Sequence, residues 1–576
     1  SFYKDEFGQK RELDPYYFPY VFSGAGDGFF NMLWNQYENS NIDDKLHIVG
    51  SAKVDLTFTN WLSATIKAGM DFTDWDYETK NKVTRLFPTV AGGKYAYRSE
   101  KYRIKNYSAF LNFNKSFFDK KLDIFAFGGP IYYQQDYNSI NAQTVGGLQF
   151  DGWYSLDAGL TQSGSFGESR GATRSSQILT SILGNASIGW DNTWYLEISA
   201  RQDWTSTLPA STYSYFYPGV SLAYDFSNNL HIPKLSYGKL RLAWADVGSG
   251  APSAYWAYPS YGLGLVPGTG AITISSPADA YQPDIRPARK REVEVGFDTK
   301  WFKSNPLDVN FSYYTYTTYD QIMGLQLAQS TSVNSIKINA GKVKSWGYEF
   351  FAKYSPISNK TNRLDVSMTL ANQYSKVLSL YPGITSYVYQ GGGAYRIVAE
   401  EGKKIGDVQA YDYKRDPKSG EKVVKSDGTY AYDNSKLVTV GNVNPYLIGG
   451  FFADYFYKNF NVHIGINYKL GGTYLSYTNY YLLGQGETKE TLKYRDEAHG
   501  GLPYYINTQG KLVKLPSHNT SAPADSKDGR VYHNGLVLDG MKDDGSGNYV
   551  PNDILITDQA YYSTFIHDVS EFFQPD

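Results

Sequence analysis

Long runs of alternating apolar and polar residues are the feature that most constrains the fold of this chain. In LDVNFSYYTYTTYD, from Leu307 to Asp320, apolar side chains take every second place as far as Tyr313, and polar ones lie between them. The runs 47–58 and 62–77 share the pattern and are joined by a tight hairpin turn. Because successive side chains of a strand point to opposite faces, these runs predict strands with one apolar and one polar face.

We predict fourteen such strands, paired into seven hairpins. Links within pairs are mostly short and links between pairs are mostly long, so short turns gather at one end of the strands and long loops at the other. The predicted strands cover residues 47–58, 62–77, 100–116, 121–137, 176–190, 194–206, 214–226, 237–248, 290–302, 307–319, 343–355, 363–376, 446–457 and 460–470, and 471–576 is predicted to be a long loop region.

The unequal strand ends favour an outer-membrane β-barrel, an all-β antiparallel fold with long extracellular loops. Lipid offers no hydrogen-bond partner to a sheet edge, so a sheet in a membrane must close on itself. The alternative is a soluble β-sandwich or propeller, whose strands average about five to six residues. Aromatic residues at the predicted strand ends suit the girdles of a membrane barrel: Trp61, Phe117, Phe118, Trp190, Trp194, Phe226, Trp301, Tyr354, Tyr457 and Phe460.

Composition excludes several other classes. The formal net charge is -2 and no dense basic block occurs, so we expect no nucleic-acid partner. The chain has no Cys, which removes disulfides, thiolate metal ligands and thiol nucleophiles. Its 7 His are scattered without metal-ligand spacing, and no apolar run reaches the about 18 residues of a membrane helix. We therefore predict no catalytic residue, no metal and no cofactor.

Several segments resemble the SusC/RagA-type TonB-dependent transporters of Bacteroidota outer membranes. NAGKVKSWGYEF, from Asn339 to Phe350, is similar to the family's Asn-x-Gly…Gly-x-Glu signature, and ARQDWTST from Ala200 to its Arg-x-Asp-x-Ser strand end. FYPGVSLAYDF, KLRLAWADVG and the block from Glu401 to Gly472 resemble further family patterns in the same order. The chain departs from the family before residue 292, where Arg289, Lys290 and Arg291 replace the usual Trp-Glu pair.

The resemblance implies a place in a barrel of about 22 strands in the bacterial outer membrane. We expect residues 1–576 to be a partial barrel domain from the interior of a longer protein, with the plug, the N-terminal extension and the terminal strands outside this chain. The family also implies a SusD-like surface lipoprotein as partner and contact with the TonB complex through the missing N-terminal part. Its members import oligosaccharides or oligopeptides across the lipid bilayer.

Aromatic residues gather in the long predicted loops. Flat rings beside Asn, Gln and Ser suit stacking on sugar rings or on peptide side chains, although such rings also serve in girdles or pack loop on loop. Arg174, Arg201 and Asp203 lie on predicted polar faces near loop-bearing strand ends, where we expect them to line the lumen. With these three, the candidate binding residues are Trp153, Tyr154, Tyr255, Trp256, Tyr258, Tyr261, Tyr387 and Tyr389.

Two functions of different classes fit these features. The first is TonB-dependent active import with a lipoprotein partner. The second is a surface adhesin or lectin-like β protein that binds glycan without transport. A passive porin is a third alternative, and the choice between glycan and peptide is left open by loops rich in Tyr.

Overall fold

The computed structural model describes residues 36–83, 92–160, 168–266, 271–277, 279–327, 333–391, 395–484, 487–493, 496–557 and 573–575. Helix is scarce there: α2 (Tyr477–Gly484) and the 3-10 turns η2 (Leu156–Ala158) and η4 (Lys489–Leu492) are short. Within these ranges no helix is both long and apolar enough to cross a membrane.

The largest sheet has 14 strands in the order β1-β2-β3-β4-β5-β6-β7-β8-β12-β13-β16-β17-β23-β24. Its order follows the chain, as expected when each strand returns beside the one before it. The strands are β1 (Ser40–Thr57), β2 (Leu62–Asn81), β3 (Lys94–Phe117), β4 (Leu122–Thr144), β5 (Glu168–Trp190), β6 (Trp194–Thr205), β7 (Ser214–Asp225), β8 (Leu235–Ser249), β12 (Ala288–Trp301), β13 (Leu307–Tyr319), β16 (Lys342–Ser358), β17 (Asn362–Ser379), β23 (Pro445–Tyr457) and β24 (Phe460–Gly471).

Each of the fourteen predicted strands coincides with one of these strands. The strands β2 to β5 are longer than predicted, with 20 to 24 residues each. The short turns were also placed correctly. Asp191 and Asn192, between β5 and β6, both have positive φ, the left-handed conformation of a tight hairpin turn.

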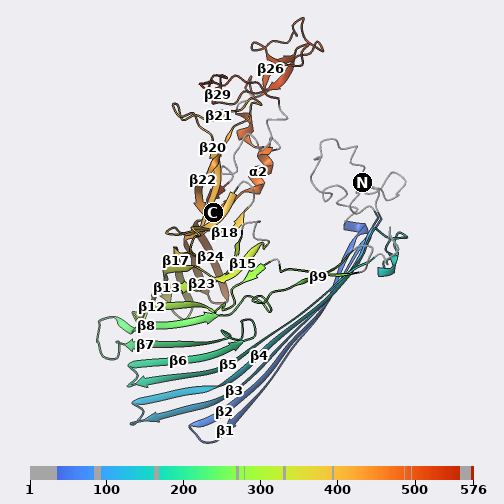
Figure 1. Cartoon of the computed structure of the whole chain (residues 1–576). Helices are drawn as coiled ribbons and strands as arrows, with labels where there is room; N and C mark the ends of the chain where they lie inside the picture. The colour runs from blue at the N-terminus through green and yellow to red at the C-terminus, as the bar shows by residue number, and fades with distance from the viewer. Residues whose placement is uncertain are drawn as a thin grey trace. The chain divides into compact units, whose positions relative to one another are not determined.

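The chain divides into two compact units. Unit 1 holds residues 1–224, 243–291 and 320–339 and contains β1 to β7, which pair antiparallel in sequence order. Figure 1 shows β1 to β5 as long neighbouring strands, coloured blue to teal. Loop segments of this unit form the short strands β9 (Gly262–Leu265), β10 (Ile272–Ser275), β11 (Asp279–Tyr281), β14 (Ile322–Gln326) and β15 (Ser335–Asn339). A small core of Leu208, Ala257 and Ile285 packs among these loops.

Unit 2 holds residues 225–242, 292–319 and 340–576. It contains the antiparallel run β13, β16, β17, β23 and β24. Its loops form β18 (Ser386–Gly391), β19 (Tyr395–Glu400), β20 (Ile405–Tyr413), β21 (Val423–Val424), β22 (Tyr432–Asn442), β25 (Thr473–Leu475), β26 (Leu502–Ile506), β27 (Leu512–Lys514), β28 (Tyr532–Gly535), β29 (Met541–Asp543), β30 (Tyr549–Pro551) and β31 (Phe573–Pro575).

The region 471–576, predicted as loop, therefore carries short strands of its own. Some pair locally, as β26 does with β27 and β28, whereas β29 pairs with β21 across more than a hundred residues. A core cluster that includes Val424, Tyr430, Leu536 and Ile556 holds the two segments together. Figure 1 shows β21, β26 and β29 grouped away from β13, β17 and β23.

Candidate functional site

The strands of unit 1 carry an apolar face that extends over only part of the length of each strand. On β2 this face begins at Leu62 and continues through Ile66 to Phe72, and the register sets Leu62 opposite Phe113 and Ile66 opposite Ala109 of β3. On β3 the same face runs from Tyr107 to Phe117 and is interrupted near the short turn by Lys115, whose Nζ lies 5.1 Å from the Phe117 ring centroid. This is close to the about 10 residues that a tilted strand needs to cross a bilayer. The apolar face therefore has the dimensions of a lipid-facing band.

Aromatic side chains border this band on both sides. Tyr107 and Tyr132 are neighbours on β3 and β4, with ring centroids 6.0 Å apart, at the loop-bearing border. At the short-turn border, Phe118 lies 6.5 Å from Trp190 and Trp194 stacks on Tyr224 at 4.3 Å. Amphipathic rings prefer the membrane interface, so these two rows suit the predicted girdles.

Beyond the band, the character of the two faces changes. On β2 the apolar face continues with Asp74, Asp76 and Glu78, where a lipid-facing strand would place apolar residues. Lys101 Nζ lies 3.0 Å from Asp74, and the hydroxyl of Tyr97 donates to Asp76 at 2.9 Å. Carboxylates and ammonium groups on this face require water, so the loop-side ends of β2 to β5 extend beyond the bilayer.

On the opposite, polar face the same extension presents four rings, Trp75, Tyr77, Tyr102 and Tyr137, which we name the aromatic wall. Trp75 lies 4.5 Å from Tyr77, and Tyr102 lies 4.6 Å from Tyr137. Register aligns Lys45, Trp75, Glu100, Ser139 and Thr173 in one row across β1 to β5.

Charged groups are held within the aromatic wall. Lys45 Nζ lies 4.7 Å from the Trp75 ring centroid, a cation–π distance. Glu100 is 4% exposed, accepts a hydrogen bond from the Tyr137 hydroxyl at 2.8 Å and pairs with Arg98. Rings, charges and hydroxyls on one face suit recognition of a polar oligomer. Sequence reasoning missed these residues, although the exchange of apolar for acidic residues after Phe72 was a readable signal.

Arg201 and Asp203 lie on the polar face of β6, as predicted, and are brought together. Arg201 Nε is 2.6 Å from Asp203 Oδ1, and Arg201 Nη2 donates to Ser181 at 2.9 Å. Asp203 also accepts from the Tyr217 hydroxyl and is 2% exposed. The pair is satisfied within the wall of the sheet.

The register of β5 gives the face on which Arg174 lies. Register sets it opposite Asn138 of β4, and Asn138 opposite Lys101 of β3. Lys101 and its partner Asp74 continue the apolar face beyond the band. Arg174 therefore shares the face of Lys101 and Asp74 on the loop side of the band, and its role in binding stays a prediction.

The aromatic residues of the loop between β8 and β12 divide into two groups. Trp256 packs against the Leu208 and Ile285 core and carries Lys337 Nζ 4.9 Å from its ring centroid. Tyr258 donates its hydroxyl to the Leu208 carbonyl at 3.1 Å. Trp256 and the Tyr258 hydroxyl thus support the loop, although the Tyr258 ring, like Tyr255 and Tyr261, is exposed.

The remaining predicted rings lie in two local groups. Trp153 lies 6.0 Å from Phe150, next to Tyr154, and burial raises the pKa of the Tyr154 hydroxyl. In unit 2, Tyr387 and Tyr389 of β18 meet edge to face with 5.3 Å between ring centroids, and Tyr389 is 50% exposed. Each group belongs to a separate loop of its own unit.

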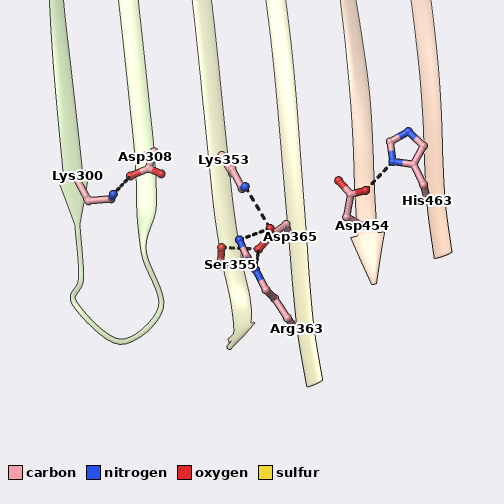
Figure 2. Close-up of polar contacts among 8 residues, drawn as sticks. All are labelled: Lys300, Asp308, Lys353, Ser355, Arg363, Asp365, Asp454 and His463. Atoms are coloured by element: carbon pink, nitrogen blue, oxygen red, sulfur yellow. Dashed lines mark hydrogen bonds and ion pairs between the residues drawn. The ribbon is translucent and has the colours of Figure 1, made fainter. Parts of the chain in front are cut away.

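The polar face of unit 2 carries a row of ion pairs near the short turns, drawn in Figure 2. Lys300 and Asp308 are 3.5 Å apart, and His463 Nδ1 lies 2.6 Å from Asp454. Asp365 is the most enclosed member of the row and contacts Lys353 at 3.1 Å, Arg363 at 2.8 Å and Ser355 at 2.7 Å. Charges on this face thus neutralise one another across neighbouring strands.

The departure from the family pattern at Arg289 and Arg291 has a structural role. Both arginines contact Asp246 of β8, at 3.1 Å and 2.9 Å. Arg289 also donates to the Phe216 carbonyl at 3.2 Å. The acidic partner lies about 40 residues away in the sequence, so the alternation pattern gave no signal for the contact.

The acidic turn from Leu538 to Asn548 forms no metal cage among the described residues. Instead, Asp543 accepts from the Gly545 amide at 2.7 Å, and Asp544 accepts from the Ser546 amide at 2.8 Å. The carboxylates therefore cap the turn between β29 and β30.

A family model described as "TonB dependent receptor-like, beta-barrel" matches residues 1–520. The chain belongs to this family. The family is one of receptors and transporters rather than enzymes, and it places the chain in the bacterial outer membrane. The predicted fold class and the resemblance to SusC/RagA-type transporters are confirmed.

Relatives of this TonB-dependent receptor barrel are distant in sequence. TonB-dependent receptor P3 of Formosa agariphila is 22% identical over 339 residues, 54% of this chain and 34% of the relative. TonB-dependent receptor P39 of the same organism is 22% identical over 441 residues, 74% of this chain and 39% of the relative. The chain thus spans between a third and two fifths of the length of these curated relatives.

Solved structures show the same fold. The match to a structure of the RagAB peptide transporter has a TM-score of 0.71 at 16% identity. It covers 98% of this chain and 63% of the matched RagAB chain. The match to the RagAB peptide importer in its closed-closed state has a TM-score of 0.68 at 18% identity. It covers 92% of this chain and 60% of the matched RagAB chain. At this level of identity, the similarity establishes the barrel fold.

Proposed function

We propose that this chain supplies barrel wall and loops to an active importer that takes up oligosaccharides or oligopeptides across the outer membrane. The aromatic wall carries the proposal, because it rises beyond the lipid band on the face that lines the interior of such barrels. A protein that only anchors a soluble module has no need of a polar, ring-bearing interior above the membrane. Membership of the TonB-dependent receptor family supports an energy-coupled step.

We further propose a SusD-like surface lipoprotein as partner. The RagAB structures are described as a peptide importer, and their barrel resembles this chain in fold. The loops of unit 2 build a cored body around Val424 and Leu536, and a body of this kind offers a rigid docking surface. Contact with TonB would run through other parts of the whole protein.

The test is purification of the full-length protein from native outer membrane in mild detergent, followed by mass spectrometry of bound material. We expect a stoichiometric lipoprotein together with a mixture of glycans or peptides. Uptake of the identified compounds should stop in cells that lack TonB. A barrel that purifies alone and empty, with surface binding unchanged by TonB deletion, would instead support the adhesin.

A further inference from the structure

Unit 2 contains a cavity of about 590 Å³ between strands of the sheet and the loops beside them. Its volume lies within the range of about 300 to 1,000 Å³ that is usual for small-molecule sites. The lining combines rings, amides and two charges of opposite sign, and includes Tyr314, Glu349, Asn372, Gln373, Lys404 and Tyr446.

The two charges of this cavity are not neutralised by protein. Glu349 lies on the polar face, since register sets it opposite Ser312, and it is exposed. Lys404 Nζ lies 5.5 Å from the Tyr374 ring centroid. Across the described ranges of the chain, neither Glu349 nor Lys404 has an ion pair, whereas Asp298 and Asp365 of the same face are each paired with arginine.

An amide of the cavity wall also has an unused acceptor. Asn372 is 5% exposed and donates through Nδ2 to the Tyr446 carbonyl. Its Oδ1 is buried and receives no hydrogen bond from any residue that the structure describes. The neighbouring Asn442 and Asn444 donate to the Ile405 carbonyl at 3.0 Å and 2.9 Å, so they shape the wall. A ligand N–H beside Asn372 would satisfy the remaining acceptor.

We propose that this cavity binds a short zwitterionic peptide, an assignment that rests on the import function proposed above. Glu349 receives the ammonium group of the free amino terminus, Lys404 receives the terminal carboxylate, and Asn372 Oδ1 accepts a backbone N–H. A neutral oligosaccharide would fill the same volume but leave both charges without a partner. Charge-assisted hydrogen bonds are the stronger kind, so the two termini provide the discrimination.

The experiment uses full-length protein in detergent and measures binding of alanine tetrapeptides by calorimetry. Three peptides are compared: one with free termini, one N-acetylated and one C-amidated, with maltotetraose as the neutral oligomer. For the unmodified protein, each blocked terminus should weaken binding about 10- to 100-fold, the value of one charged hydrogen bond. Maltotetraose should bind more weakly than the free peptide.

Two variants assign each terminus to its residue. In Glu349→Gln, N-acetylation should no longer weaken binding while C-amidation still does, and Lys404→Met should show the reverse. Glu197→Gln is the matched control, because Glu197 lies on the polar face of unit 1 and accepts from Asn185 at 2.8 Å. It should behave like the unmodified protein.

The proposal is overturned if both variants keep the full preference for free termini, or if maltotetraose binds as tightly as the free peptide. Electrophoretic heat-modifiability confirms that each variant is folded. An uptake assay distinguishes a failure of the cavity assignment from a failure of the proposed import function. If peptides enter cells in a TonB-dependent manner while Glu349→Gln changes nothing, the cavity assignment alone fails. If nothing is imported, the proposed function itself fails.

Discussion

The ring of Tyr314 lies against Gly347 on the neighbouring strand. The two residues are register partners on β13 and β16. A Cβ on Gly347 would stand 2.6 Å from the Tyr314 hydroxyl oxygen and 2.1 Å from the Asn372 carbonyl oxygen. Tyr314 also stacks on Tyr316 with 6.2 Å between centroids. Gly347 is part of the signature from Asn339 to Phe350. Glycine is required there because a side chain has no room, and not because of the backbone conformation.

Gly347→Ala should destabilise the barrel. The added methyl group meets backbone as well as a ring, and overpacking of this kind costs about 1 to 3 kcal/mol. Gly50→Ala is the control, because nothing lies within 4 Å of its Cβ position. Urea unfolding in detergent, followed by heat-modifiability, compares the two variants. Equal unfolding midpoints would show that β13 and β16 adjust without cost.

The fourteen strands were predictable because alternation is a local property of the chain, visible in stretches such as Leu307 to Tyr313. The short strands of the loops were not predictable by this means. Tyr430, for example, donates to the Asp539 carbonyl across 109 residues, and no local pattern encodes such a contact. The structural roles of Trp256 and Tyr258 likewise depend on contacts with residues distant in the sequence, such as Leu208.

The face of the strand on which Arg174 lies was not predictable for a related reason. A strand position is assigned to a face by counting from its neighbours, and a shift by one residue moves the side chain to the other face. The predicted strand began at residue 176, after Arg174, whereas the structure continues β5 back to Glu168. Register with Asn138 then fixes the outward face.

The limited height of the lipid band predicts that the same substitution destabilises the barrel inside the band and has little effect beyond it. Ile66 and Ile140 both lie on the outward face and are 46% and 60% exposed, but Ile140 is level with Asp76 and Ser99, beyond the band. Ile66→Arg should cost about 2 to 4 kcal/mol, as for arginine at the bilayer midplane. Ile140→Arg should be close to neutral. Folding into lipid vesicles measures both, and similar losses would place the band elsewhere.

Asp246→Asn should weaken the barrel, because it leaves Arg289 and Arg291 without their shared carboxylate. The Asp246 side chain is 5% exposed, and loss of charged hydrogen bonds at a buried acceptor costs about 1 to 3 kcal/mol. Asp55→Asn is the control, since Asp55 pairs with Lys53 at 2.7 Å with its side chain 51% exposed. Thermal unfolding should separate the variants, and an unchanged midpoint for Asp246→Asn would contradict a role in stability.

Asp279 should make the pairing of β11 with β15 dependent on pH. The Ser335 hydroxyl, 2.6 Å away, and Lys337 lower the pKa of Asp279 below its ordinary value. A lowered pKa in the folded state means that the stabilisation is present above the unfolded pKa of about 3.9 and is lost as pH falls below it. Hydrogen exchange of residues 335–339 should accelerate in acid, relative to the intrinsic rate, and at neutral pH in Asp279→Asn. Asp157→Asn, in the separate segment η2, should leave it unchanged.

The aromatic wall predicts an effect on substrate binding that depends on the face of the sheet. Trp75→Ala removes one ring of the wall and the surface beneath Lys45, whereas Tyr97→Ala removes a ring of similar size from the outward face, where it hydrogen-bonds Asp76. Loss of a stacking ring should weaken affinity about 3- to 10-fold. Calorimetry with the material that co-purifies with the full-length protein measures both. Equal losses in the two variants would mean that general destabilisation, and not contact with the wall, explains the effect. The wall joins a half-buried Trp, three Tyr rings and the buried Glu100 on one face, and Trp75 is its largest ring. If Trp75→Ala leaves the affinity unchanged, the substrate does not bind at the wall.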